Sequence, residues 1–480
     1  MLRRITVLHH NISVPDGSNL LEVLRNARIA MDTPCGGNGK CGKCRVIIDG
    51  ESRLACQTTV DRDMAVSIDH PVSEPRETVF TSAAAQKPVL AFDIGTTTVV
   101  GFLLDAATGK TLASQSRLNP QCAYGADVIS RIQYAVRHTH EPLTQQIRQC
   151  MDDMVRRLCS STATPPEKIG IVSIAGNPAM QQLFLGIPPE NLAKIPFAPI
   201  LTLAKTEKAS TCLPILTNAD MQIIPDIGGF AGADTVACIL STELDQSDDI
   251  CLLVDIGTNG EMVLGNKHRM VACATAAGPA LEGANISCGM RANTGAIDHV
   301  WPENGTFQYS VIGDCAAEGI CGSGLIDAVA AALEMGLINA RGRIHNDERI
   351  IRLSDKVMIT QEDIRQLQLA KGAIAAGIHM MAKHMGISLS DIRRVLLAGA
   401  FGSHMNPKSA CRMGLLPAEL ADRVIPVGNA AGEGAKCLAL QPELLPYTQK
   451  IVNKTEFLEL ASMAEFNDCY VDCLLFEEEE

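Results

Sequence analysis

The stretch 89–98, Val-Leu-Ala-Phe-Asp-Ile-Gly-Thr-Thr-Thr, recurs at 251–260 as Cys-Leu-Leu-Val-Asp-Ile-Gly-Thr-Asn-Gly. Each copy is an apolar run that ends in Asp-Ile-Gly-Thr, and the two aspartates, Asp93 and Asp255, are 162 positions apart. Both copies continue alike, with a second apolar strand, a turn and a third strand. A repeat at this distance indicates a duplicated domain.

The Asp-Ile-Gly-Thr segment, placed between two strands, has the composition of a phosphate-binding loop. Glycine lets backbone N–H groups approach phosphate oxygens, threonine hydroxyls donate to the same oxygens, and the aspartate binds magnesium directly or through water. One copy alone would be weak evidence, because the same pattern also occurs in ordinary hairpin turns; the repeat is what favours a nucleotide site. The residues expected to make these contacts are Asp93, Gly95, Thr96, Thr97, Asp255, Gly257, Thr258, Asn259 and Gly260.

Three further segments suit a nucleotide clamp. The apolar run 395–398 predicts a buried strand that ends in a glycine turn, which offers flat backbone to an adenine ring. The turn consists of Gly399, Ala400, Phe401 and Gly402. Segments 225–234 and 428–435, the second beginning at Gly428, are rich in small residues and predict helix starts that can cross closely. Helices of small residues also occur as packing devices without a functional role.

Cysteine spacing singles out the beginning of the chain. Four of the 18 cysteines lie within 22 positions in the pattern C-x5-C-x2-C-x11-C, and four glycines are interspersed among the first three. Glycine allows the positive φ angles with which a loop can wrap its N–H groups around bridging sulfides. The four cysteines are Cys35, Cys41, Cys44 and Cys56.

Local patterns around this loop predict a hairpin over residues 4–14, a helix that begins after Ser18 or Asn19, and a second hairpin that turns at 49–50. Strand, strand, helix, cysteine loop and strand is the order of a β-grasp ferredoxin. The segment resembles plant-type [2Fe–2S] ferredoxin domains, and this resemblance implies that the four cysteines are the iron ligands. Its x5 spacing and its near fourth cysteine depart from the commonest C-x4-C-x2-C pattern.

Two other kinds of site have similar residue patterns to this cysteine loop. A four-cysteine zinc knuckle also needs four thiolates, but such sites usually contain two C-x2-C pairs and need no glycine-lined loop. The segment 37–44 fits a Walker A loop except that cysteine replaces the final Ser or Thr, which removes the magnesium-binding hydroxyl. We reject the Walker A interpretation.

Prolines and weak periodicity in residues 71–88 predict a mobile linker. The expected organisation is then a ferredoxin-like domain over 1–70, the linker, a first ATPase subdomain over 89–248, a second over 249–460 and an acidic tail over 461–480. The expected fold class is an α+β β-grasp ferredoxin domain followed by a duplicated α/β actin-like, ribonuclease-H-like ATPase domain.

The order of phosphate loop, connecting helix, phosphate loop, adenosine loop and connecting helix resembles the actin, heat-shock-70 and sugar-kinase ATPase superfamily. Within it, several segments are similar to the reductive activators of corrinoid proteins, which also place a [2Fe–2S] domain ahead of the ATPase. The resemblance covers about residues 3 to 450. The similar segments are 119–132, 175–178, 276–283 and 321–327.

This resemblance implies ATP-dependent reductive activation, in which one electron passes from the [2Fe–2S] cluster to Co(II) of a corrinoid protein in a methyltransferase system. It implies Mg-ATP as a cofactor, a low-potential electron donor and a homodimer. By analogy with acidic residues of the superfamily, Asp226 or Asp234 orients the hydrolytic water; the alternative for each is a helix cap. Two rival functions stay open: a redox-regulated small-molecule kinase, and a non-catalytic ATP-gated binding module.

Overall charge and hydropathy restrict the partners. The chain has 54 acidic and 41 basic side chains, a net charge of −13, which disfavours nucleic acid and anionic membrane surfaces. It has no apolar run of the length needed to span a membrane and no signal-peptide core at its start, so we expect a cytoplasmic protein.

Overall fold

The computed structural model describes residues 2–7, 10–27, 29, 31, 37, 39, 44–68, 76–80, 85–402 and 404–476. They form two compact units, each described by itself. The first comprises Met1–Val172, Ala179–Pro196 and Lys208–Asp220. The second comprises Ser173–Pro178, Phe197–Glu207 and Met221–Glu480.

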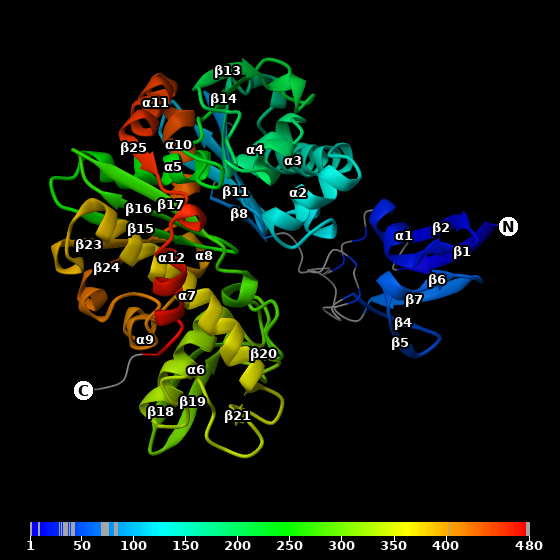
Figure 1. The fold of residues 1–480 in the computed structure, drawn as a ribbon. Coiled ribbons are helices and arrows are strands. Elements are labelled where there is room, and N and C mark those ends of the chain that lie inside the picture. Colours follow the sequence, from blue (N-terminus) through cyan, green and yellow to red (C-terminus); the bar gives the residue numbers. More distant parts are fainter. Residues whose placement is uncertain are drawn as a thin grey trace. The chain divides into compact units, whose positions relative to one another are not determined.

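The N-terminal segment of the first unit is a five-stranded sheet in the order β2-β1-β7-β4-β5 (Figure 1). Its strands are β1 (Leu2–Val7), β2 (His10–Pro15), β4 (Arg45–Ile48), β5 (Glu51–Leu54) and β7 (Met64–Ile68). β1 pairs antiparallel with β2 and parallel with β7, whereas β4 pairs antiparallel with β5 and β7. The two predicted hairpins and the β-grasp order are confirmed.

Helix α1 (Leu20–Asn26) covers this small sheet. The Asn19 side chain accepts a hydrogen bond from the Glu22 N–H at 3.3 Å, so Asn19 is the cap. The apolar side of α1 and the inward residues of the strands bury one another, because alternate residues of a strand face the same side. A two-stranded ladder of β3 (Ser18–Asn19) and β6 (Thr59–Val60) and a short turn η1 (Ala55–Gln57) complete this part.

The first repeat copy forms the centre of a seven-stranded sheet in the order β13-β14-β12-β9-β10-β11-β8. Its strands are β8 (Arg76–Val79), β9 (Pro88–Ile94), β10 (Thr98–Asp105), β11 (Lys110–Leu118), β12 (Ile171–Gly176), β13 (Lys205–Lys208) and β14 (Asp220–Ile223). Strand β8 corrects the expected linker over 71–88, because residues 76–79 pair antiparallel with β11. β8 is a short edge strand that pairs with β11 through its backbone, so its sequence needs no apolar periodicity.

The second copy forms a six-stranded sheet in the order β24-β23-β15-β16-β17-β25. Its strands are β15 (Cys251–Ile256), β16 (Gly260–Gly265), β17 (Met270–Thr275), β23 (Arg394–Ala398), β24 (Val424–Gly428) and β25 (Thr455–Phe457). In both copies the strand before the Gly-Thr loop pairs antiparallel with the next strand, and that strand pairs antiparallel with the third. The predicted duplication is therefore confirmed in the strand register.

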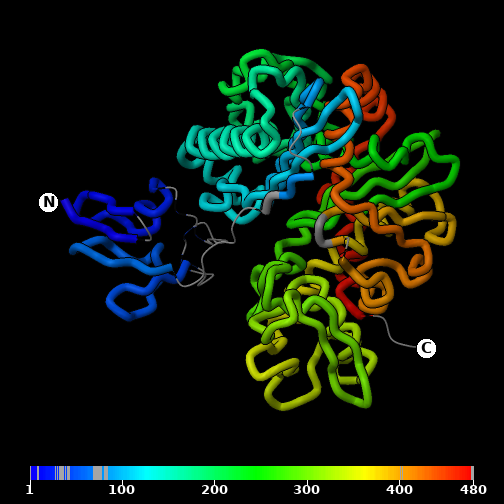
Figure 2. Tube along the Cα trace, turned by 180° about the vertical axis from the view of Figure 1, so that it is seen from behind, coloured from blue at the N-terminus to red at the C-terminus, as the bar shows by residue number. Residues whose placement is uncertain are grey.

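Helices pack beside these sheets (Figures 1 and 2). In the first unit, Gly101 of β10 leaves no room for a side chain, because a Cβ there would lie 2.6 Å from the Phe92 ring of β9 and 3.2 Å from Met154 of α3. The helices after α1 are α2 (Val128–Arg137), α3 (Glu141–Ser161), α4 (Pro178–Leu185), α5 (Ala233–Thr242), α6 (Gly322–Glu334), α7 (Gln361–Met385), α8 (Gly399–Gly402), α9 (Pro407–Arg412), α10 (Ala430–Leu440), α11 (Leu445–Lys454) and α12 (Phe466–Asp472). The smaller sheets contain β18 (Ala296–Glu303), β19 (Thr306–Val311), β20 (Gly319–Ile320), β21 (Ile350–Arg352) and β22 (Met358–Thr360). Over the described residues, no helix has the length and hydropathy that crossing a membrane requires.

The end of the chain packs along α7 instead of extending as the tail expected over 461–480. Helix α12 lies beside α7 in both views (Figures 1 and 2). The Gln368 side chain donates to the Leu474 carbonyl at 2.8 Å, and the Phe476 N–H donates to the Ala340 carbonyl at 2.8 Å. These contacts make residues up to 476 part of the second unit.

Candidate nucleotide and iron–sulfur sites

The first Gly-Thr loop connects β9 and β10 in a tight turn. The Gly95 N–H donates to the Thr98 carbonyl at 3.0 Å, and a Cβ on Gly95 would lie only 2.6 Å from that same oxygen. Any side chain would therefore force the turn open. Asp93 lies one residue before the end of β9, so Asp93 and the loop residues Thr96 and Thr97 share one end of the hairpin.

The second loop connects β15 and β16 in the same way. The Gly257 N–H donates to the Asn259 carbonyl at 2.9 Å. Thr258 is buried, and its hydroxyl donates to Glu282 Oε1 at 3.1 Å. A hydroxyl has one proton to donate, so a phosphate oxygen and Glu282 would compete for it, while its lone pairs suit a cation.

Glu282 is not among the residues predicted for the site. It lies in segment 276–283, which carries part of the family resemblance. Its position in a turn that follows the third strand of the second copy, η7 (Pro279–Glu282), is the signal that could have found it.

The expected adenosine loop meets the second phosphate loop. Strand β23 runs parallel to β15, with Ala398 opposite Asp255, so the carboxyl ends of both strands lie at one edge of the sheet. Gly399 follows with a φ of +89°, and a Cβ there would lie 2.7 Å from Asp255 Oδ1. The side chains of Ala400 and Phe401 lie outside the described residues. At Gly402, a Cβ would lie 2.9 Å from the Leu397 side chain.

Four carboxyl groups of the second unit lie close enough to affect one another's charge: Asp226 is buried, whereas Asp234, Asp255 and Glu261 are partly buried. Burial raises the pKa of Asp255 to about 7, and the negative charge of Asp234 adds to the rise. Burial also raises the pKa of Asp234 to about 6. The pKa values of Asp226 and Glu261 are raised well above their ordinary range, first by burial and then by the charge of Asp234. Loss of water favours the neutral form of every member, so a cation would be strongly attracted here.

Asp226 is the most poorly solvated of these acids. It is 1% exposed, and neither of its carboxylate oxygens has a hydrogen-bond partner of good geometry among the described residues. The backbone N–H of Ala233 only partly offsets the rise in its pKa. A buried carboxylate in this state requires a proton, a cation or a bound water.

The helix-cap alternative for the two aspartates is wrong. Helix α5 begins at Ala233 and its cap is Gly232, without a side-chain hydrogen bond. Asp226 therefore lies six residues before the cap, and Asp234 lies in the first turn, where its carboxylate accepts from the Thr235 N–H at 2.7 Å.

Glu261 was not predicted either. It follows Gly260 directly, where the first copy has Val99, and an acidic residue inside an otherwise apolar strand is the signal that could have indicated it.

The small-residue helices do cross closely, as predicted. A Cβ on Gly434 of α10 would lie 2.1 Å from the Ala237 carbonyl of α5, so the helix backbones are in contact. Gly428 has a φ of +67°, and the next residue, Asn429, caps α10 by accepting from the Gly432 N–H at 2.7 Å. The Gly428 turn therefore precedes a helix whose start is fixed by side-chain capping.

Magnesium would need ligands beyond these acids. Within the described ranges, no three His, Cys, Asp or Glu side chains are grouped so that they could hold a metal ion. Mg²⁺ usually binds through one or two carboxylates together with waters and nucleotide phosphates. Asp255 and the Gly-Thr loop that follows it fit this mode of binding.

Two of the four predicted cluster ligands are described. Cys44 is buried and Cys56 is partly buried, and the Ala55 N–H donates to the Cys44 carbonyl at 2.8 Å, which joins the two cysteine segments. Gly37 has a φ of +95°, and a Cβ there would lie 3.7 Å from Cys56 Cβ. Gly37 thus lies against the fourth cysteine, as a cluster cradle requires. Cys35 and Cys41 lie outside the described residues.

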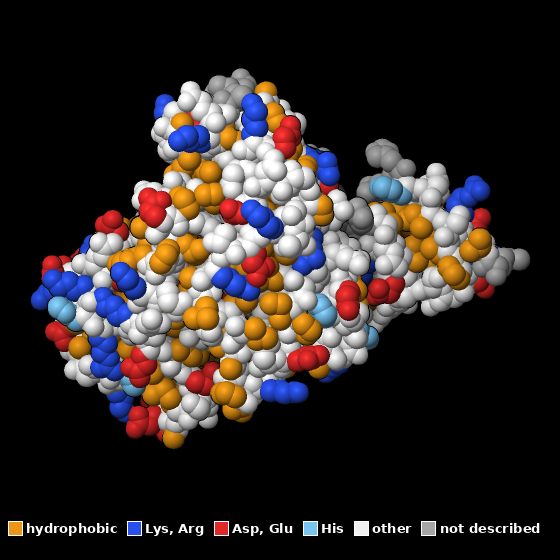
Figure 3. All heavy atoms as spheres, turned by 90° about the horizontal axis from the view of Figure 1, so that it is seen from above, with side chains coloured by type: hydrophobic (Ala, Val, Ile, Leu, Met, Phe, Trp, Pro, Cys, Tyr) orange, Lys and Arg blue, Asp and Glu red, His pale blue; other side chains and the backbone are white. Residues whose placement is uncertain are grey.

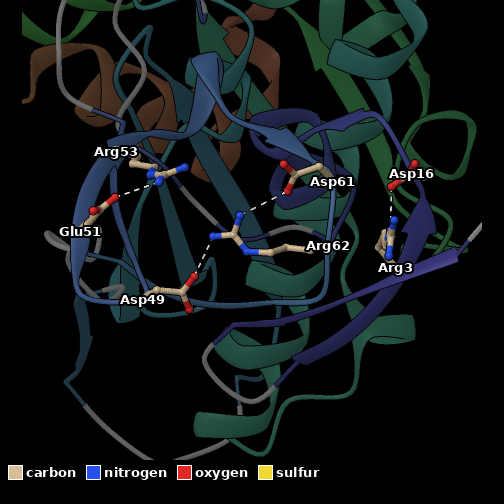
Figure 4. Close-up of polar contacts among 7 residues, drawn as sticks. All are labelled: Arg3, Asp16, Asp49, Glu51, Arg53, Asp61 and Arg62. Carbon is tan, nitrogen blue, oxygen red and sulfur yellow. Dashed lines mark hydrogen bonds and ion pairs between the residues drawn. The ribbon is translucent and has the colours of Figure 1, made fainter.

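Exposed ion pairs cover the outside of the ferredoxin-like segment (Figure 4). Arg62 reaches Asp49 at 2.8 Å and Asp61 at 3.6 Å. Arg3 pairs with Asp16 at 2.7 Å, and Arg53 pairs with Glu51 at 2.8 Å. Exposed pairs of this kind add little stability. Acidic and basic side chains are likewise interspersed on the face drawn in Figure 3.

Comparisons with known proteins match three successive stretches of the chain. Residues 5–64 match the 2Fe-2S iron-sulfur cluster binding domain, residues 89–247 match the RACo middle region, and residues 249–480 match the C-terminal domain of RACo, the ASKHA domain. The Corrinoid activation enzyme RamQ of Eubacterium limosum is 36% identical over 422 residues, covering 82% of this chain and 71% of the relative.

Two less similar relatives are also named for their action on corrinoid proteins. The [Co(II) methylated amine-specific corrinoid protein] reductase of Methanosarcina barkeri is 27% identical, over 80% of this chain and 76% of that protein. A solved structure of a Reductive activator for corrinoid,iron-sulfur protein superposes with a TM-score of 0.74 at 28% identity, covering 99% of this chain and 98% of that one.

Fold and site together define a [2Fe–2S] ferredoxin domain joined to a duplicated actin-like ATPase. The chain belongs to the family of reductive activators of corrinoid proteins. It is an iron–sulfur, ATP-binding enzyme of corrinoid activation.

Proposed function

We propose that this protein uses ATP to return an inactive corrinoid protein of a methyltransferase system from Co(II) to Co(I), with one electron drawn from its [2Fe–2S] cluster. The observation that carries this proposal is that one chain contains both the cysteine loop around Cys44 and Cys56 and two copies of a phosphate loop, the second of which follows Asp255, an acid whose pKa is raised by desolvation and by the charge of Asp234. The names of its relatives supply the class of electron acceptor.

Energetics explain why an ATPase accompanies the cluster. A plant-type cluster has a potential near about −400 mV. If the corrinoid couple is still more negative, each 59 mV of the gap costs roughly 1.4 kcal/mol for one electron. ATP offsets this cost only if the nucleotide-bound and nucleotide-free proteins bind the two corrinoid states with different affinities.

Specific residues have separate roles in this proposal. Cys35, Cys41, Cys44 and Cys56 bind the cluster. The two Gly-Thr loops bind the phosphates, Asp93 and Asp255 bind Mg²⁺ directly or through water, and the Gly399 turn binds adenine. Asp226 orients the hydrolytic water, because its buried oxygens lack hydrogen-bond partners of good geometry among the described residues. Asp234 sets the charge around it.

Several finer features belong to the same proposal. The ferredoxin domain over 1–70 is the electron carrier, and 89–248 and 249–460 are the two halves of the ATPase. A low-potential donor supplies the electron, the protein acts in the cytoplasm, and it forms a homodimer as its family resemblance implies.

An anaerobic reduction assay tests this function. The protein with a reconstituted cluster is mixed with reductant and a Co(II) corrinoid protein of a methyltransferase system, with and without Mg-ATP, and the Co(I) absorption band is followed. We expect Co(I) only when ATP is present. Absence of ATP-dependent Co(I) would contradict the proposal, and a phosphorylated small molecule formed instead would favour the kinase alternative.

A further inference from the structure

Three consecutive carbonyl groups of the first phosphate loop accept hydrogen bonds from one neighbouring segment. The Asn119 amide donates to the Gly95 carbonyl at 2.9 Å, and the Asn119 backbone N–H donates to the Thr97 carbonyl at 2.8 Å. Between them, Arg131 Nη2 donates to the Thr96 carbonyl at 2.5 Å. The loop backbone is therefore held on one side at every residue from 95 to 97.

The segment that supplies these donors is itself rigid. Asn119 and Arg131 are both fully buried. The Asn119 side-chain oxygen accepts from the Gln121 N–H at 3.0 Å, which caps the short turn η2 (Pro120–Ala123). Arg131 lies on α2, and its Nε donates to the Gly125 carbonyl at 2.9 Å. Because the Asn119 and Arg131 side chains are each fixed by a second hydrogen bond, the loop carbonyls that they contact have little freedom to move.

Because peptide groups are planar, fixing the loop carbonyls also fixes the direction of the N–H groups that share their peptide bonds. Both peptide bonds between residues 95 and 97 are trans. In a planar trans peptide, the carbonyl and the N–H that share the bond point in opposite directions. Fixing the Gly95 and Thr96 carbonyls toward Asn119 and Arg131 therefore turns the Thr96 and Thr97 N–H groups toward the other side. Successive N–H groups that converge in this way form an anion-binding concavity.

We propose that Asn119 and Arg131 are positioning residues that orient the first loop for nucleotide phosphate. Burying an arginine is costly, and its planar fork suits a site where several acceptors must be held at once. The Arg131 charge also lies directly behind the loop and attracts an anion through one peptide layer. This inference rests on the proposed binding of nucleotide by Thr96 and Thr97.

The second loop has no equivalent of Asn119. Thr98 pairs with Leu118 in the first copy, and Gly260 pairs with Thr275 in the second, so Ala276 occupies the place that corresponds to Asn119. A methyl group has no hydrogen to donate to a carbonyl. The second loop is instead joined to Glu282 through the Thr258 hydroxyl. The arrangement around the first loop is thus an addition to one copy of the duplicated unit.

Two substitutions with a matched control test the proposal in the full-length protein with its cluster. Asn119→Asp keeps the acceptor for the Gln121 N–H and replaces the donor to Gly95 with a repelling oxygen. Arg131→Met keeps the unbranched apolar part of the side chain and removes the guanidinium donors. The control is Arg148→Met, because Arg148 donates to the Phe184 carbonyl at 2.8 Å in the same unit and does not contact the loop.

The measurement is the dissociation constant of Mg-ATP and, separately, of adenosine. We expect Asn119→Asp and Arg131→Met to weaken Mg-ATP binding about tenfold or more and to leave adenosine binding within about twofold, because the oriented N–H groups contact phosphate and not the base. Arg148→Met should change neither constant. The melting temperature and the visible spectrum of the cluster verify folding.

Each other outcome has a defined meaning. Equal weakening of ATP and adenosine by Asn119→Asp would show a purely structural role and overturn the inference. If Thr97→Val weakens ATP binding while Asn119→Asp and Arg131→Met bind normally, the inference fails and the proposed function stands. If the unmodified protein binds no ATP, the proposed function itself fails. Should Arg131→Met not fold, Asn119→Asp decides alone.

Discussion

Gly399 lies so close to Asp255 that a Cβ on the glycine would be 2.7 Å from the carboxylate Oδ1. This contact joins the adenosine turn to the second phosphate loop across two parallel strands. Position 399 requires glycine for a second reason, because its backbone is left-handed, with a φ of +89°. The contact makes the proposed base and magnesium sites sterically dependent on each other.

Gly399→Ala should therefore weaken nucleotide binding as well as stability. We expect a loss of about 1–2 kcal/mol from the left-handed backbone, and a reduction of ATP affinity of about tenfold because Asp255 is displaced. Gly386→Ala is the matched control: Gly386 has a φ of +68°, but no atom lies within 4 Å of its ideal Cβ. It should lose comparable stability and keep its ATP affinity. Equal ATP affinity in both variants would contradict the proposed coupling.

Asp255→Asn should stabilise the nucleotide-free protein in a pH-dependent way. Burial raises the pKa of Asp255 from 3.8 to about 7, so the folded state favours the neutral carboxyl. When an acid has a higher pKa in the folded than in the unfolded state, the free energy of unfolding decreases as the pH rises from the unfolded pKa to the folded pKa. Above the folded pKa the whole of this stability has been lost. The melting temperature of Asp255→Asn should exceed that of the wild type clearly at pH 8 and much less at pH 5.

The same variant should lose nucleotide dependence, because a neutral amide attracts Mg²⁺ weakly. The visible spectrum of its cluster should be unchanged. A gain in melting temperature that is the same at both pH values would refute the assignment of the raised pKa to Asp255.

Gly434→Ala should destabilise the protein although alanine favours helices by about 1 kcal/mol over glycine. The added methyl would lie 2.1 Å from the Ala237 carbonyl and push α10 away from α5. We expect a net loss of about 1–3 kcal/mol, measured as a lower melting temperature. Gly170→Ala, at a site with nothing within 4 Å of the ideal Cβ, should be nearly neutral. A melting temperature at or above the wild-type value for Gly434→Ala would rule out this close helix contact.

Asp226→Asn should separate hydrolysis from binding. If Asp226 orients the attacking water, the turnover of ATP falls by about 10²–10⁴ while ATP affinity changes little. Asp234→Asn removes a charge that raises the pKa of Asp226, and we expect a smaller effect on turnover. Steady-state ATP hydrolysis with a parallel binding titration gives both quantities. A larger turnover loss in Asp234→Asn would reverse the two roles.

Cys56→Ser should remove electron transfer and preserve ATP hydrolysis. The change deletes one thiolate ligand from the loop that Gly37 folds against, so the visible absorption of the cluster should disappear. Hydrolysis should stay within about twofold, since the cluster and the ATP site lie in separate folded segments. Cys315→Ser replaces an exposed cysteine and should affect neither activity. Joint loss of both activities in Cys56→Ser would mean that the two functions are not separable.

Local sequence patterns predicted the parts of this protein whose geometry depends on neighbouring residues. The Gly-Thr turns, the Asn19 cap and the hairpin at 49–50 are of this kind. The pairing of 76–79 with β11 was missed, because a short edge strand held by backbone hydrogen bonds needs no apolar pattern. The packing of residues up to 476 along α7 was missed because acidic residues suggested a solvated tail.

By itself, the sequence determined the duplicated phosphate loops, the cysteine spacing and the family, because these depend on residue type at fixed intervals. Only the tertiary structure decided that the charge of Asp234 acts on Asp226, Asp255 and Glu261, and that Gly399 lies against Asp255. The sequence also did not reveal that Asn119 and Arg131 hold the carbonyls of a loop more than twenty residues away. Burial and carbonyl direction depend on how distant segments pack, and no interval along the chain encodes that packing.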